Sequence, residues 1–144
     1  MNIKDGVKAL KNDLKSHRYY LQQYEKISET IDDMWYKLEG VSGLDPSKVT
    51  TENHNIEMTE EKRLEMLEKI EQMIKQKEHI EERIKYVKGI LHEIESDMLG
   101  PTVDIYIKGK TFQATATKYD LYPSYLEYRI DKNLSDIIKK RGGN

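Results

Sequence analysis

Two long runs of residues at alternating spacings of four and three constrain this chain most. The first run covers residues 3–38, at Ile3, Val7, Leu10, Leu14, His17, Leu21, Tyr24, Ser28, Ile31, Trp35 and Leu38. The second covers residues 66–98, at Met66, Ile70, Met73, Lys77, Ile80, Ile84, Val87, Leu91, Ile94 and Met98. A repeat of about 3.5 residues places these side chains on one side of an α-helix. Each run, called a seam below, therefore predicts a long helix with one apolar face.

Two helices of similar length with such faces bury them most simply by folding back on each other. We therefore predict an all-α protein that begins with a long antiparallel, coiled-coil-like helical hairpin over residues 1–98. Gly40 should end the first helix, the Thr59 hydroxyl should cap the second, and Gly100-Pro101 should end it. Residues 39–58 are rich in Gly, Ser, Thr and Asn and predict a loop.

The polar residues within the seams bear on how the helices associate. Ser28 also interrupts the first seam, whereas His17 and Lys77 occupy positions where a polar side chain can fix register or partner number, although a solvent-exposed edge is the default prediction for them. The apolar faces are wide enough to admit a second copy of the chain. We therefore expect a homo-oligomer, most simply a dimer.

The C-terminal stretch from Gly109 to Lys140 has the pattern of two short helices joined by a turn. Thr111 is placed to cap the first helix, and Pro123 suits the first turn of the second. The second helix has a buried stripe at Leu126, Ile130, Leu134 and Ile137. We therefore predict a helix-turn-helix domain in residues 99–144.

Residues 101–117 admit a second interpretation. Val103, Ile105 and Ile107 alternate as in a β-strand, and the residues after them would turn the chain into a β-hairpin. We predict helix instead, because Pro101 suits a helix start and the downstream helices need a helical partner.

The charge of the chain is unevenly distributed. The net charge is −2, yet residues 100–144 carry 8 basic and 5 acidic side chains, whereas residues 59–99 carry 8 and 11. Charged residues make up 35% of the chain and hydrophobic residues 37%, which fits long solvated helices. The positive surplus thus coincides with the predicted helix-turn-helix, where a nucleic-acid partner would need it.

Composition also excludes several kinds of chemistry. The chain has no cysteine, so a disulfide framework, a cysteine zinc site and a thiol nucleophile are all absent. His92-Glu93 is followed by Ser96 where a zinc protease motif needs histidine, and no phosphate-binding glycine loop occurs. We expect no enzyme, cofactor or metal. With no apolar run of membrane-spanning length, we also expect a cytoplasmic protein without membrane contact.

The C-terminal motif resembles that of phage-encoded transcriptional regulators of the ArpU and RinA type. The resemblance rests on the lead-in Tyr106-Ile107, Gly109-Lys110-Thr111-Phe112, and on Leu126, Ile130, Lys132 and Leu134 in the second helix. Gly40-Val41-Ser42-Gly43 is similar to a further element of that family. The resemblance implies a helix-turn-helix like the sigma-70 region that reads the −35 promoter element. Its implied partners are double-stranded promoter DNA and, as a further possibility, RNA polymerase of a bacterial host.

This sequence departs from the family pattern at four positions. Ala114 stands in place of a capping acid, Thr115 in place of an aliphatic residue, Asp120 in place of glycine and Tyr122 in place of a serine cap. Asp tolerates the left-handed turn conformation reasonably well. The other departures predict a less stable first helix.

The outward face of the second helix is the candidate DNA-binding surface. It carries Ser124, Tyr125, Tyr128, Lys132, Ser135 and Lys139, with Arg129 on its flank. With the resemblance, Arg129 and Lys132 would contact phosphate or guanine, Tyr122, Tyr125 and Tyr128 the sugar-phosphate chain or a thymine methyl, and Gln113 and Lys118 the adjacent backbone. The plainer interpretation of this face is a solvated helix surface.

We therefore predict a phage or prophage DNA-binding transcriptional regulator. One alternative is a DNA-packaging adaptor resembling small terminase subunits, which would form a ring of many copies. The other is a coiled-coil protein-interaction or anti-repressor module that binds no DNA.

Overall fold

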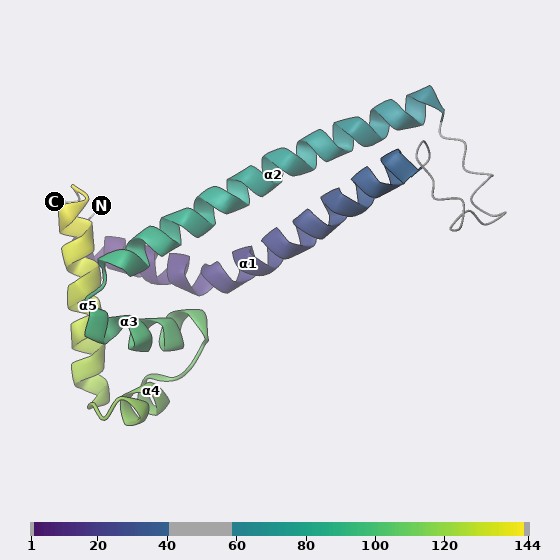
Figure 1. Ribbon diagram of the computed structural model, residues 1–144. Coiled ribbons are helices and arrows are strands. Elements are labelled where there is room, and N and C mark those ends of the chain that lie inside the picture. The colour runs from purple at the N-terminus through teal and green to yellow at the C-terminus, as the bar shows by residue number, and fades with distance from the viewer. Residues whose placement is uncertain (1, 41–58, 143–144) are drawn as a thin grey trace. The chain divides into compact units, whose positions relative to one another are not determined.

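A computed structural model of the chain describes residues 2–40 and 59–142. The described residues form α1 (Ile3–Gly40), α2 (Glu60–Glu93), α3 (Ser96–Thr102), the π-helix η3 (Val103–Ile107), α4 (Phe112–Lys118) and α5 (Pro123–Lys140), with no strand among them (Figure 1). The predicted all-α class is confirmed. The β-hairpin alternative for residues 101–117 fails, because the alternating residues of that stretch lie in the π-helix.

The chain divides into two compact units of opposite charge. The first unit, Met1–Leu21 with Glu82–Asn144, contains 16 Lys and Arg and 11 Asp and Glu, a surplus of five positive charges, and is called the basic unit below. The second, Gln22–Glu81, contains 8 and 15, an excess of seven negative charges, and is called the acidic unit. The predicted functional division at residue 98 stays a prediction, because compactness groups the chain differently.

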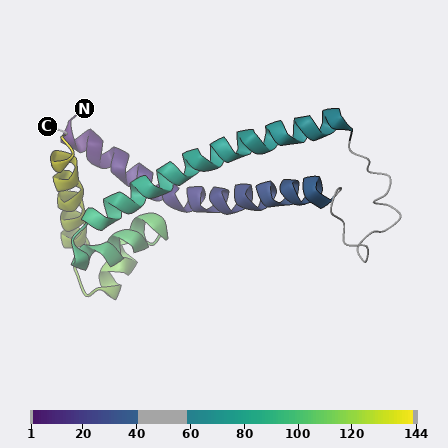
Figure 2. The same ribbon diagram turned by 45° about the horizontal axis from the view of Figure 1, so that its top comes forward.

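The core of the basic unit takes side chains from every helix that the structure describes. Its most deeply buried members, at 0 or 1% exposure, are Leu14, Val87, Ile90, Ala116, Leu126, Ile130 and Leu134. The predicted buried stripe of α5 is confirmed, since Ile137 is also only 3% exposed. Within this unit α3 and α4 both lie against α5, as two views show (Figures 1 and 2). The core therefore fixes which face of α5 is left to solvent.

The end of the second seam differs from the prediction. We expected one helix running to Gly100-Pro101, but α2 ends at Glu93 and α3 begins at Ser96, so Gly100 and Pro101 lie within α3. A side chain of α5 stabilises the break between α2 and α3, because Asn133 Oδ1 accepts the Glu95 N–H at 2.9 Å. That bond replaces a helical hydrogen bond and lets the chain change direction at Glu95.

In the acidic unit, the distal parts of α1 and α2 run antiparallel and side by side (Figures 1 and 2). This arrangement is compatible with the predicted hairpin, whose connecting residues 41–58, including most of the Gly40–Gly43 element, lie outside the described residues.

The predicted cap of α2 is confirmed, since Thr59 Oγ1 accepts the Lys62 N–H at 3.2 Å. Lys77 lies over the Tyr24 ring, with Nζ 5.2 Å from its centroid.

His17 differs from the prediction that polar seam residues lie at a solvent-exposed edge. The side chain is 5% exposed in the basic unit, and its Nδ1 has no hydrogen-bond partner among the described residues. Burial and the charge of Lys88 lower the pKa of His17 below its usual 6.5. His17 is therefore a buried neutral imidazole and does not lie at a solvent-exposed edge of the helix.

None of the described helices combines the length and the apolarity that crossing a membrane requires.

Candidate nucleic-acid interface

The helix preceding the candidate face, α4, begins as the sequence predicts. Thr111 has an extended backbone and its Oγ1 accepts the Ala114 N–H at 3.0 Å, which is the geometry of an N-cap. Thr115, at the position where an aliphatic residue was expected, is 1% exposed, and its hydroxyl donates to Thr111 O at 2.8 Å. The hydroxyl is satisfied within the helix, so the buried threonine leaves no unpaired polar group.

A tight turn of four residues joins α4 to α5. Asp120 adopts φ 58°, the left-handed conformation predicted for it, and its N–H donates to Thr117 O at 3.3 Å. The Leu121 N–H donates to Ala116 O at 2.8 Å. Together these bonds form a Schellman motif, which ends a helix and fixes the direction of the chain after it. The α4–turn–α5 segment is thus compatible with the predicted helix-turn-helix.

The first turn of α5 relies on proline rather than on a side-chain cap. Pro123 occupies the start of the helix, where its missing N–H costs nothing, and the preceding Tyr122 makes no capping hydrogen bond. Tyr122 is 80% exposed, so the absent serine cap has been replaced by a ring that extends into solvent.

The outward face of α5 is exposed along its length. Tyr128 is 59% and Tyr125 43% exposed. The other exposed residues predicted for this surface are Ser124, Lys132 and Lys139 on α5 and Gln113 and Lys118 on α4, while Ser135 is half-buried. The face therefore presents phenol and hydroxyl groups with two lysines.

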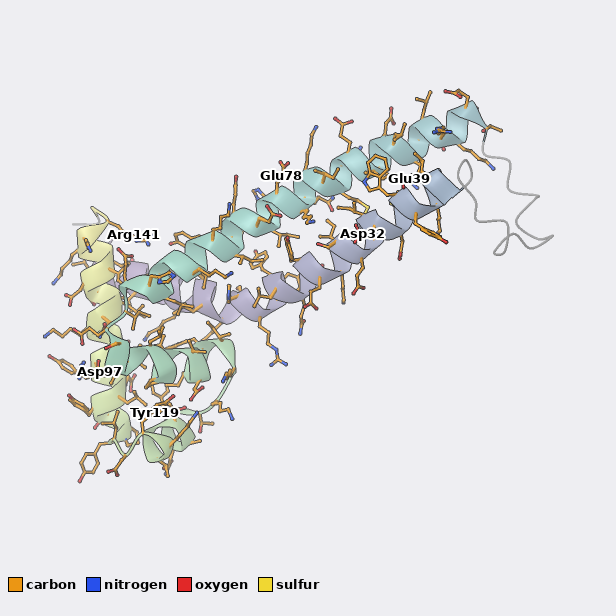
Figure 3. All side chains as sticks on the ribbon, viewed as in Figure 1. Asp32, Glu39, Glu78, Asp97, Tyr119 and Arg141 are labelled. Atoms are coloured by element: carbon orange, nitrogen blue, oxygen red, sulfur yellow. The ribbon has the colours of Figure 1, made fainter. Side chains whose placement is uncertain are left out.

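Arg129 is held by partners that the sequence did not reveal. Its guanidinium donates to Tyr125 Oη at 3.0 Å, to Asp97 Oδ2 at 3.0 Å and to Glu95 Oε2 (Figure 3, where Asp97 is labelled beside α5). The Tyr125 hydroxyl, followed by the two carboxylates, raises the pKa of Arg129 above its usual range. The arginine is 20% exposed and stays charged, but its hydrogen bonds point towards the protein.

Lys118 is engaged in a similar way by Asp104. Its Nζ lies 2.9 Å from Asp104 Oδ2, and the Tyr119 hydroxyl donates to the same oxygen at 3.2 Å (Tyr119 is labelled in Figure 3). Asp104 is 2% exposed, and the Lys118 bond lowers the pKa of that carboxyl despite its burial. Asp104 therefore joins η3 to the end of α4 as a buried carboxylate.

The structure thus separates the predicted site residues into two groups. Ser124, Tyr125, Tyr128 and Lys132 share the outward face of α5, with Lys139 further along it, Tyr122 exposed just before its first turn and Gln113 on α4. Arg129 and Lys118 are bound to carboxylates. Glu95, Asp97, Asp104 and Asn133 are the important neighbours that sequence reasoning missed. The only early sign of them was the polar character of Asp104 between the apolar Val103 and Ile105.

No cluster that could hold a metal ion accompanies this face in the described part of the chain. Within residues 2–40 and 59–142, no three histidine, aspartate or glutamate side chains gather closely enough to hold a metal ion. Hydrogen-bonding and cationic groups are what the face offers to a ligand.

Comparison with models of known protein families, with curated proteins and with solved structures finds no match in any of the three.

Proposed function

We propose that this chain is a DNA-binding transcriptional regulator of phage or prophage type, in which α4 and α5 act as a helix-turn-helix. In this proposal α5 enters the major groove of promoter DNA. One observation carries it: the exposed face of tyrosines and lysines belongs to the unit that holds the positive surplus of the chain. The resemblance to ArpU- and RinA-type regulators supports the same conclusion.

The geometry refines the part that each residue plays in the proposal. Ser124, Tyr125, Tyr128 and Lys132 make the direct contacts, because they are exposed on one face near the start of α5, and the exposed Tyr122 adds a contact from just before that helix. Phenol and hydroxyl groups donate to phosphate oxygens, and lysine contacts phosphate or guanine.

The carboxylate-bound cations take positioning roles. Arg129 holds the Tyr125 hydroxyl, and its guanidinium lies beside that ring at 5.7 Å from the centroid. Lys118 fixes the end of α4 through Asp104. Lys139 and Gln113 contact the adjacent sugar-phosphate backbone.

The experiment that tests DNA binding is fluorescence anisotropy of the full chain on duplex fragments from its own genomic neighbourhood. We compare the wild type with Tyr128→Ala/Lys132→Ala. The matched control is Tyr36→Ala/Lys37→Ala, which removes an exposed tyrosine and an exposed lysine from the acidic unit. We expect the first variant to lose binding to the preferred fragment by about ten- to a hundredfold, as for the loss of two good contacts. The control should bind as the wild type does.

Two results would overturn the proposal. One is wild-type binding no stronger than to unrelated duplexes at physiological salt, in a protein that is helical by circular dichroism. The other is an equal loss in both variants, which would place the DNA contact away from α5.

A second function is favoured by apolar side chains that the acidic unit leaves exposed. Leu64 is 54% exposed, and Ile74 and Trp35 are each 37% exposed. Such residues suit a helical partner, either a second copy of the chain or another protein. This supports the coiled-coil interaction module as the runner-up and supports self-association under either function.

Sedimentation velocity of the wild type and of Leu64→Gln/Ile74→Gln separates these alternatives. A wild-type dimer that dissociates in the variant, together with DNA binding, supports the regulator with paired half-sites. A ring of many copies supports the packaging adaptor. A monomer in both proteins, together with an absence of DNA binding, leaves the protein-interaction module.

A further inference from the structure

A row of basic residues follows α1 through the basic unit. It consists of Lys4, Lys8, Lys11, Lys15 and Arg18, and is called the basic row below. Each member comes one residue after a seam position, so the row keeps the same alternating spacing and lies along one edge of the buried face. Because the spacing is helical, all five cations share one side of α1.

The charge at the position directly after each seam residue of α1 changes sign where α1 passes from the basic unit into the acidic unit. Beyond the neutral Gln22, the next positions of the same progression are Glu25, Glu29 and Asp32, which belong to the acidic unit. If these residues served only to solvate the helix, either sign of charge would do so equally well. The restriction of positive charge to the basic unit therefore points to an anionic ligand there.

Most of the basic row is available to such a ligand. Lys4, Lys8, Lys15 and Arg18 are exposed, and none of them forms an ion pair with any part of the chain that the structure describes. Lys11 is the exception, because its Nζ lies 2.6 Å from Asp131 Oδ1 of α5. Four exposed cations thus stand along one side of the helix.

The N-terminal part of the row adjoins the candidate DNA-binding helix. Lys4, Lys8 and Lys11 line an open groove together with Asp5 of α1 and with Asp131 and Ser135 of α5. Gly6 packs against Ile138 so closely that a β-carbon would collide with it. The glycine lets α1 approach α5, and Ser135 belongs to the outward face predicted for α5. The row therefore continues the charged and hydroxyl-bearing surface of α5 onto α1.

We propose that the basic row binds phosphates of the duplex whose major groove receives α5. This inference rests on the proposed function and assigns α1 a second role besides packing. From Lys4 to Arg18 the helix rises about 21 Å. Duplex DNA carries one phosphate charge per about 1.7 Å of axis, so several phosphates fall within reach of the row. Lysine and arginine side chains that reach phosphates hold the protein in register without reading sequence.

The test is fluorescence anisotropy of the full chain on a short mixed-sequence duplex across a salt series. The variant is Lys4→Gln/Lys8→Gln/Lys15→Gln, and the matched control is Lys62→Gln/Lys69→Gln/Lys75→Gln, which removes the same charge from exposed positions of the acidic unit. Glutamine preserves helix propensity. We expect the variant to bind on the order of a hundredfold more weakly at 0.15 M salt, with a salt dependence shallower by about three counterions, and the control to bind as the wild type does.

The outcomes separate this inference from the proposed function. If Tyr128→Ala/Lys132→Ala loses binding to the preferred fragment and the basic-row variant matches the control, the basic row is refuted while the role of α5 stands. If the basic-row variant loses affinity and Tyr128→Ala/Lys132→Ala does not, the basic row is supported and the role of α5 is refuted. If the wild type binds no duplex, both fail. Circular dichroism of each variant shows that it is folded.

Discussion

The basic and acidic units carry the same seam pattern, but they cover the apolar residues beside it to different extents. In the basic unit, Leu10, Leu14 and Val87 are at most 4% exposed, because α3, α4 and α5 complete the core around α1 and α2. In the acidic unit, where two helices stand alone in the described chain, the seam residues Ile31, Leu38 and Ile70 are also at most 6% exposed, but Ile74 beside the seam stays 37% exposed. A single neighbouring helix covers the centre of a wide apolar stripe but not its flanks. The number of packing partners therefore decides whether the flanks of a seam are covered.

The same comparison holds for charge. The basic unit has a positive surplus of five and the acidic unit a negative excess of seven, although α1 and α2 contribute to both. A whole-chain charge of −2 conceals this contrast. Charge counted by compact unit therefore says more about a nucleic-acid partner than charge counted by chain.

The largest expected effect tests the difference in burial. Leu134→Ala empties a site that is 0% exposed in the basic unit and should lower the free energy of unfolding by about 2–5 kcal/mol. Leu64→Ala, at 54% exposure in the acidic unit, should cost less than about 1 kcal/mol in a dilute monomer. Urea denaturation of both variants measures the two values. Equal losses would show that Leu64 is as fully covered as Leu134.

A smaller effect concerns the buried carboxylate of the basic unit. Asp104→Asn removes the charge that Lys118 and Tyr119 contact, and should lower the free energy of unfolding by about 1–3 kcal/mol. Hydrogen exchange should show faster opening of η3 and α4, with unchanged protection of α2 residues in the acidic unit. Uniform loss of protection through both units would contradict the prediction that the Asp104 carboxylate stabilises the basic unit alone.

The pH dependence of stability should also differ between the units. Because burial and Lys88 lower the pKa of His17, the folded chain resists protonation more than the unfolded chain does. The stability contributed by neutral His17 is fully present above its unfolded pKa near 6.5 and falls as the pH drops below that value. His17→Leu should lessen the fall in melting temperature between pH 7.5 and pH 5.

The control for this prediction is His79→Gln, which changes an exposed histidine of the acidic unit. It should keep the pH dependence of the wild type. If His79→Gln lessens the dependence and His17→Leu does not, the titrating group lies in the acidic unit and the assignment to His17 is wrong.

The smallest expected effect is at the turn of the basic unit. Asp120 adopts φ 58°, which glycine adopts without a steric penalty, so Asp120→Gly should raise the free energy of unfolding by up to about 1 kcal/mol. Asp120→Ala should lower it, because alanine meets the penalty without the local hydrogen bonding of aspartate. Thermal denaturation of both variants decides the point. A gain in the alanine variant would mean that the turn does not hold this conformation.

The candidate site could be predicted in part. The exposed positions of α5 follow from helical spacing once Leu126 and Ile130 are recognised as buried, so Tyr125, Tyr128 and Lys132 were found correctly as surface residues. The local turn chemistry of Thr111 and Asp120 was predictable too, since each acts on residues within a few positions of itself.

The ion pairs that Arg129 and Lys118 form with carboxylates could not be predicted in this way. Arg129 is bound by Asp97, 32 residues earlier in the chain, and Lys118 by Asp104, 14 residues earlier. Such pairs form only when the core has brought their helices together, so charge patterns along a single helix do not reveal them.

The sequence by itself determined that this protein is helical, where most helices begin, and which face of each helix is apolar, because these properties depend on neighbours within one or two turns. The tertiary structure alone decided that α2 stops at Glu93, that His17 is buried, and that the chain divides into units of opposite charge. Those properties depend on contacts between residues far apart in sequence, such as the Asn133 side chain that accepts the Glu95 N–H, and periodicity carries no information about them.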